Sequence, residues 1–284
     1  MVKGRRRVPW PPTRSTASVT PTLCHKPGDY RGLVNSAVWR VLEGRAKARP
    51  ADPVLTFVDG SGQRTELSAK TLANNAAKAA NALVDEAFIE SGSNIAFRVP
   101  WHWQRAVWSL AAWLVDATVV PNGDPADCDL VIAGPEESAL ITGARDLWVV
   151  SLHPFGLPNP SVPAGASDAA TIARMQPDSF MPQDAEPLTP ALDLSRLHVN
   201  PAQEDELPAG ATQDELLAAA TGIGSRFGLV AGGRGLVVGE PEGAATAWLI
   251  ASLVALACDA SIVIATGEVD ASAVAAQESA RLLR

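Results

Sequence analysis

The sequence predicts an α/β fold, with a mostly parallel sheet, covering helices and βαβ units. Short apolar runs at residues 95–99 and 118–120 flank a helical stretch at 103–115, and a crossover of that length joins parallel strands. A second strand–helix–strand succession occupies residues 236–265. With 284 residues, 47% of them hydrophobic and 19% charged, the chain is large and apolar enough to bury a sizeable core.

Three elements precede the first βαβ unit. Residues 33–48 carry apolar side chains at three- and four-residue spacing and stop before Pro50, which predicts an amphipathic helix. Residues 53–67 alternate apolar and polar side chains on either side of a Gly-rich turn, which predicts a β-hairpin. Ser68 is then the expected N-cap of a helix rich in Ala and Leu at residues 69–86.

The middle of the chain continues the sheet. Buried-type strands are predicted at residues 129–133 and 147–152, with a weaker helix at 136–143, so that this region forms a doubly wound α/β sheet. Order resumes at Thr212, which forms a capping box with Glu215 and begins a helix. A last helix is predicted at residues 270–284, capped by Asp270 or Ser272.

We therefore expect four segments. Residues 1–28 are basic and Pro-rich and are predicted to be a disordered tail, and residues 29–153 form the first α/β segment. Frequent prolines and acidic residues predict an irregular excursion at 154–211. Residues 212–284 form a second βαβ segment packed on the first.

Composition excludes several classes of function. The net charge of −8 disfavours sequence-independent binding of nucleic acid, and the longest apolar run, residues 244–258, is too short to cross a membrane. Three cysteines and four histidines show no metal-ligand spacing, so we expect no metal, no cofactor and a reducing, cytoplasmic location. Asp124, Asp127 and Asp129 cluster without the pattern of a calcium loop and are interpreted as a solvated loop.

Four of the eight tryptophans lie within residues 101–113. Trp103, Trp108 and Trp113 fall on the helix predicted at 103–115 and are expected to be scaffold, because helices that cover a parallel sheet are apolar most of the way round. Trp101 and His102 follow the strand at 95–99, at the sheet edge where open α/β sheets bind ligands.

Two further residues complete the predicted ligand site. His153 ends the strand at 147–152 and is expected at the same edge as His102, while Arg234 follows two glycines in a tight connection and could meet an anion. The site predicted from the sequence is therefore Trp101, His102, His153 and Arg234, with no catalytic residue. The glycines of residues 222–228 follow a helix and are interpreted as a turn, because dinucleotide binding needs them between a strand and a helix.

The order of these elements resembles the N-terminal part of the adenylate-forming superfamily, the AMP-binding acyl-CoA synthetases and their relatives. The matching stretches are residues 53–57, 67–83, 92–100, 116–121 and 235–266. They include Gly92-Ser93-Asn94-Ile95-Ala96 and the run of residues 118–121 that ends in Pro121, which are scaffold features of that family. The resemblance implies the fold of the first part of an adenylate-forming domain.

The departures from the family pattern concern its phosphate chemistry. The resemblance implies a Ser/Thr/Gly-rich loop with a lysine that holds the ATP phosphates, but residues 198–217 stand there and contain Glu204, Asp205 and Glu206. No lysine follows Lys78, and the sequence stops at Arg284, about where the family's second lobe would begin.

We therefore expect a non-catalytic pseudoenzyme that binds a partner protein or a small ligand such as an acyl or adenosine moiety. Two alternatives stay open. One is a diverged AMP-dependent synthetase or ligase with an altered site. The other is a structural or partner-binding subunit, which could form an oligomer.

Overall fold

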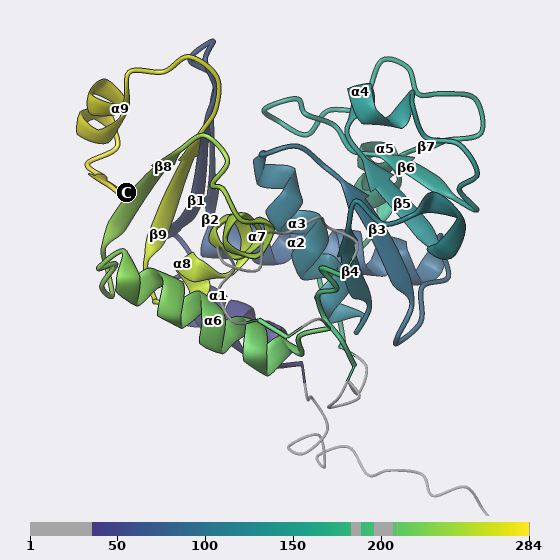
Figure 1. Ribbon diagram of the computed structural model, residues 1–284, viewed down its shortest axis with the longest axis horizontal. Coiled ribbons are helices and arrows are strands. Elements are labelled where there is room, and N and C mark those ends of the chain that lie inside the picture. Colours follow the sequence, from purple (N-terminus) through teal and green to yellow (C-terminus); the bar gives the residue numbers. More distant parts are fainter. Residues whose placement is uncertain (1–35, 183–188, 196–206, 209, 284) are drawn as a thin grey trace, which may run out of the picture. The chain divides into compact units, whose positions relative to one another are not determined.

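The computed structural model describes residues 36–182, 189–195, 207–208 and 210–283, and all of them belong to one compact unit (Figure 1). The tail predicted at residues 1–28 and the acidic residues 204–206 lie outside the described residues. The described chain has mixed α/β content with two five-stranded sheets flanked by helices, as the sequence predicts.

One sheet, sheet B, is parallel throughout and has the order β4-β3-β5-β6-β7. Its inner strands contain runs of buried apolar residues, Leu130–Ala133 in one and residues 95–97 in its neighbour, as is usual for parallel sheets covered on both faces. The strands are β3 (Asn94–Arg98), β4 (Thr118–Pro121), β5 (Leu130–Ala133), β6 (Leu147–Val149) and β7 (Ser167–Asp168).

The other sheet, sheet A, joins the two ends of the described chain in the order β10-β8-β9-β1-β2. The hairpin of β1 and β2 is antiparallel, and β1 pairs in parallel with β9, from the C-terminal βαβ unit. The predicted first and second segments therefore share this sheet. Its strands are β1 (Pro53–Val58), β2 (Arg64–Ser68), β8 (Arg234–Val238), β9 (Ser261–Ala265) and β10 (Arg281–Leu282).

A layer of helices separates the two sheets (Figure 1). Helix α3 contacts α2 and α7 as well as strands β1 and β4, and every one of its residues is buried. The helices are α1 (Ala37–Ala48), α2 (Ala69–Asp85), α3 (Trp103–Leu114), α4 (Pro135–Ser138), α5 (Ala169–Met175), α6 (Gln213–Arg226), α7 (Ala244–Ser252), α8 (Val254–Ala257), α9 (Ala271–Gln277) and the 3₁₀ turn η2 (Pro125–Asp127).

The capping residues confirm several predicted helix starts. The Ser68 hydroxyl accepts a hydrogen bond from the backbone N–H of Thr71 at the start of α2. At the start of α6, the Thr212 hydroxyl accepts from the N–H of Glu215 while the Glu215 carboxylate accepts from the N–H of Thr212. The Asp270 carboxylate caps α9, as one of the two predicted alternatives.

Four local predictions need correction. Helix α6 continues to Arg226, so Gly222 and Gly224 are helical and do not form the predicted turn. A Cβ on Gly224 would lie 2.2 Å from the Cys258 sulfur, so glycine there allows α6 to pack closely on α8. The segment 154–211 contains β7 and α5, and the last helix ends at Gln277. Helix α4 ends at Ser138, well short of residue 143.

Candidate functional site

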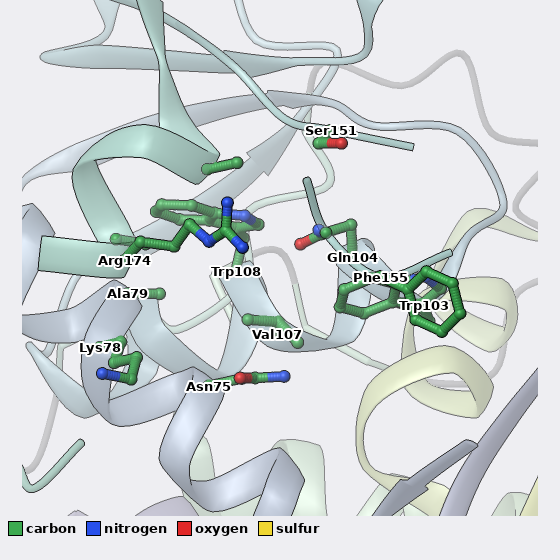
Figure 2. Close-up of a pocket in the computed structure, with 13 residues that line it drawn as sticks. Asn75, Lys78, Ala79, Trp103, Gln104, Val107, Trp108, Ser151, Phe155 and Arg174 are labelled. Carbon is green, nitrogen blue, oxygen red and sulfur yellow. The ribbon is translucent and has the colours of Figure 1, made fainter. Parts of the chain in front are cut away.

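A cavity of about 240 Å³ lies between α2, α3, α5 and the loop after β6 (Figure 2). We call it the α3–α5 pocket. Helix α3 contributes Trp103, Gln104, Val107 and Trp108, whose spacing places them on one side of the helix near its N-terminus. Because this end of α3 follows strand β3, the pocket lies toward the carboxyl side of sheet B, the side on which open α/β sheets bind ligands.

The tryptophans of α3 are both scaffold and pocket wall. Trp113 is fully buried, and its indole N–H donates to the carbonyl of Ala191 at 2.7 Å. Trp108 packs edge-on against Trp148, with ring centroids 5.9 Å apart, and also lines the pocket. The predicted scaffold role is thus seen in the packing, and Trp103 and Trp108 border the cavity as well.

The charged side chains that line the pocket are all positive. Arg174 of α5 and Lys78 of α2 line it, and no acidic side chain does. The Lys78 amine donates to the carbonyl of Gln176 at 2.7 Å, so its charge is directed to the edge of the pocket. Among the described residues, no hydrogen-bonding partner is found for the exposed Arg174 guanidinium or for the side-chain amide of Gln104, which is only 6% exposed.

Trp101 and His102, both in the predicted site, are buried. The Arg105 guanidinium lies 5.6 Å from the centre of the Trp101 ring, and His102 lies beside the hairpin of sheet A. His102 is the N-cap of α3, and its Nδ1 accepts from the backbone N–H of Gln104 at 3.3 Å. Its ring packs edge-on against Phe57 at 4.4 Å. Burial lowers the pKa of His102 to about 3, although the charge of Asp59 and the backbone of Leu152 act in the opposite direction.

His102 is therefore neutral at physiological pH. Its Nε2 is buried without a hydrogen-bonding partner in the described part of the chain. Because Nδ1 accepts a hydrogen bond, the neutral ring carries its proton on Nε2, which can donate one hydrogen bond but holds no positive charge for an anion.

His153 follows Leu152, whose backbone lies beside His102, but the His153 side chain is exposed to solvent. The His153 ring is exposed, its Nδ1 accepts from the backbone N–H of Phe155 at 3.1 Å, and the two rings are 5.8 Å apart. His153 therefore shapes the loop that carries Phe155 into the α3–α5 pocket.

Arg234, the fourth predicted residue, lies on the opposite face of sheet A. Neighbouring residues of a strand point to opposite faces, and Phe57 contacts His102 whereas Thr56 accepts a hydrogen bond from Arg234 at 2.8 Å. The Arg234 guanidinium also donates to Glu278 at 2.6 Å and to Glu66 at 3.1 Å. The anions that Arg234 meets are thus carboxylates of this chain, and it does not join the other three residues.

A second cavity, of about 270 Å³, lies at the carboxyl ends of β3 and β4, but its main cation is already paired. Arg105 donates to the carbonyl of Val99 and to Glu240 at 2.5 Å, and its guanidinium stacks over Trp248 at 4.5 Å from the ring centre. This arrangement joins α3 to the segment after β8 and is satisfied without a ligand.

Of the three aspartates that cluster after β4, two accept hydrogen bonds from backbone N–H groups. Asp124 caps η2 by accepting from the N–H of Ala126, and Asp129 accepts from the N–H of Asn94 at 3.0 Å. Within the described ranges, no group of three or more His, Cys, Asp or Glu side chains is arranged to hold a metal ion. No helix among those residues is long and apolar enough to span a bilayer.

Comparison with known proteins identifies the fold. No family model matches the chain. A TIGR03089 family protein of Mycobacterium tuberculosis is 37% identical over 149 residues, which cover 50% of this chain and 61% of that protein. The chain thus spans about three fifths of this curated relative.

Solved structures match over more of the chain at lower identity. An acyl-CoA synthetase from Brucella canis has a TM-score of 0.68 at 15% identity, covering 88% of this chain and 47% of that one. Acetoacetyl-CoA synthetase from Streptomyces lividans gives 0.64 at 15%, with 86% and 41% covered. Apo MatB from Rhodopseudomonas palustris gives 0.62 at 16%, with 88% and 49% covered. The described chain therefore has the fold of acyl-CoA synthetases, over a portion that amounts to less than half of each of those proteins.

Proposed function

We propose that this chain is a ligand-binding relative of the adenylate-forming synthetases that does not itself activate a carboxylate with ATP. The observation that supports this most directly is the N-terminus of α6, which follows the place where the family resemblance implies the phosphate loop. The N-terminus of a helix binds phosphate through free backbone N–H groups and a positive dipole end.

In this chain, carboxylates already occupy that end of the helix. The Glu215 carboxylate accepts hydrogen bonds from the backbone N–H of Thr212 at 2.8 Å and from its hydroxyl at 2.9 Å. These bonds lower the pKa of Glu215, so the group is ionised at physiological pH. Asp214 adds a second negative charge in the same turn. A triphosphate approaching α6 would meet two like charges in place of a cationic cradle.

The lysines of the chain support the same conclusion. The last one is Lys78, in α2, and its amine is bonded to the Gln176 carbonyl in the α3–α5 pocket. No residue of this chain therefore corresponds to the lysine that the resemblance implies for the phosphate loop.

Pyrophosphate exchange tests the proposal. The chain is incubated with ATP, labelled pyrophosphate and a panel of aliphatic and aromatic carboxylic acids, with an active acyl-CoA synthetase as positive control. We expect no acid-dependent exchange, and no heat of ATP binding by calorimetry. Acid-dependent exchange that increases with the amount of the chain would refute the proposal and favour a diverged ligase with an altered site.

A partner-binding subunit is the second candidate, and exposed apolar side chains favour it. Phe88, Phe155, Met175 and Met181 are each about 80% exposed, and exposed apolar side chains mark an interaction surface where they gather into one patch. Size-exclusion chromatography with light scattering tests this function. A dimer or larger assembly supports it, whereas a monomer at high concentration counts against a self-associating subunit.

A further inference from the structure

We propose that the α3–α5 pocket binds a small aromatic anion, with the ring against Trp103 and Trp108 and the anionic group on Arg174. The inference deepens the proposed function and rests on it, because it names the class of ligand that a non-activating relative would hold. It is carried by three features of the pocket: its size, the Gln104 amide, which has no hydrogen-bonding partner among the described residues, and the Arg174 guanidinium, which has no acidic partner among them.

The volume and the aromatic walls of the α3–α5 pocket favour a ligand with a single ring. At about 240 Å³ the cavity is below the ~300–1,000 Å³ that is typical of pockets for drug-sized ligands. It therefore fits a single ring with short substituents better than a nucleotide or a CoA thioester. Trp103, Val107 and Trp108 supply an apolar wall, and Phe155 also lines the pocket. Aromatic walls favour a flat ring through offset or edge-to-face contacts.

The side-chain amide of Gln104 favours a ligand whose ring carries a polar substituent. Gln104 is 94% buried, the complement of its 6% exposure, and its side chain extends into the cavity (Figure 2). No hydrogen bond to this amide is found in the described part of the chain. Neither amide atom is among the described side-chain atoms that are fully buried without a partner, so the amide opens onto the pocket, where a ligand group can pair with it. A ring hydroxyl or carbonyl at this position would pair with the amide.

The positive charge of Arg174 favours a ligand with an anionic group. The Arg174 guanidinium extends from α5 toward the Gln104 amide across the pocket (Figure 2). Unlike Arg105 and Arg234, which are held by Glu240 and Glu278, it has no acidic partner among the described residues. A planar guanidinium binds a carboxylate or a phosphate through two parallel hydrogen bonds. The shared chemistry is an aromatic ring that carries one such group.

Calorimetric titration of the full chain tests the inference. The probes are 4-hydroxybenzoate, phenyl phosphate, cyclohexanecarboxylate and the neutral benzamide. We expect one or both aromatic anions to bind, and benzamide and the saturated acid to bind at least about tenfold more weakly. The stronger of the two aromatic anions then identifies carboxylate or phosphate as the group that Arg174 holds.

Two variants locate the binding in the pocket. Arg174→Gln removes an exposed charge and should weaken the aromatic anions about tenfold while leaving benzamide unchanged. The matched control is Arg40→Gln, another exposed arginine, on α1 outside the pocket, which should bind like the parent chain. Gln104→Leu should weaken 4-hydroxybenzoate more than phenyl phosphate, which has no ring hydroxyl, and circular dichroism verifies that each variant folds.

Three results would overturn the inference. They are equal binding of benzamide and the anions, equal effects of Arg174→Gln and Arg40→Gln, and no heat from any probe at about 10 mM. The pyrophosphate exchange assay, run with 4-hydroxybenzoate as the acid, separates the two proposals. Acid-dependent exchange would refute the proposed non-catalytic function even if Arg174→Gln weakens binding. If no probe binds and no exchange occurs, only the proposed ligand of the α3–α5 pocket is refuted.

Discussion

The neutral, buried His102 makes the stability of this protein depend on pH in a defined window. Its pKa is lowered from an ordinary 6.5 to about 3, chiefly by burial. Below pH 6.5 the unfolded chain therefore binds a proton at this position that the folded chain does not bind. The free energy of unfolding contributed by His102 is fully present above pH 6.5 and decreases as the pH falls toward 3.

The magnitude follows from the size of the shift. Each pH unit within the window corresponds to ~1.4 kcal/mol, so lowering the pH from 6.5 to 5 removes about 2 kcal/mol. The full loss at pH 3 is roughly 4–5 kcal/mol on the same basis, which is a large part of the ~5–15 kcal/mol typical of a folded domain. Carboxylates with lowered pKa values, such as Glu278 and Asp168, contribute mainly below pH 5.

Substitution by asparagine separates the titration from the other roles of the ring. In His102→Asn the side chain still caps α3, because asparagine is a strong N-cap residue, but nothing titrates there. At pH 7.5 the variant should lose about 1–3 kcal/mol, since the ring packed against Phe57 is removed.

Urea unfolding at pH 7.5 and pH 5 measures both effects. Between these two values the parent chain should lose about 2 kcal/mol more than His102→Asn. His153→Asn is the matched control, because it changes an exposed histidine, and its loss should parallel that of the parent chain. Equal losses in His102→Asn and the parent would show that the buried imidazole does not govern this window.

Two further predictions concern packing, and urea unfolding measures both. Gly224→Ala should destabilise the chain by about 1–3 kcal/mol because its Cβ would meet the Cys258 sulfur, and adding Cys258→Ala should restore most of this loss. Gly222→Ala, on the same helix with open space around it, should instead stabilise by about 0.5–1 kcal/mol, and the same sign at both positions would contradict the reasoning. Trp113→Phe should cost about 1–3 kcal/mol through loss of the bond to the Ala191 carbonyl and of ring volume, and an unchanged midpoint would disprove it.

Local signals in the sequence predicted most elements of the fold. Ser68, Thr212 and Asp270 mark helix starts because each side chain satisfies backbone N–H groups that the helix leaves free. The pairing of β1 with β9 could not be predicted in this way, since the two strands are about two hundred residues apart and periodicity carries no information on partners. The glycines of α6 misled for a related reason, because Gly224 is required by contact with α8 rather than by a turn.

The candidate site was accessible to sequence reasoning only in part. The rule that open sheets bind ligands beyond the carboxyl ends of strands led to Trp101 and His102, which border the N-terminus of α3. It could not distinguish the two sides of that helix end. His102 turns to Phe57 of sheet A, whereas Gln104, two residues later, turns to the pocket beside sheet B.

This division explains how one tryptophan-rich helix serves as both scaffold and site. Because α3 lies between two sheets, most of its circumference is apolar, and its aromatic residues pack against the element that covers them. Trp113 is covered completely, by contacts that include Ala191. Near the N-terminus, α5 and the loop carrying Phe155 leave a gap over Trp103 and Trp108. Two of the polar side chains that border it, Gln104 and Arg174, have no hydrogen-bonding partner among the described residues. In this fold a ligand would thus complete the cover of α3, so the packing that makes these tryptophans part of the scaffold also forms the wall of the proposed binding pocket.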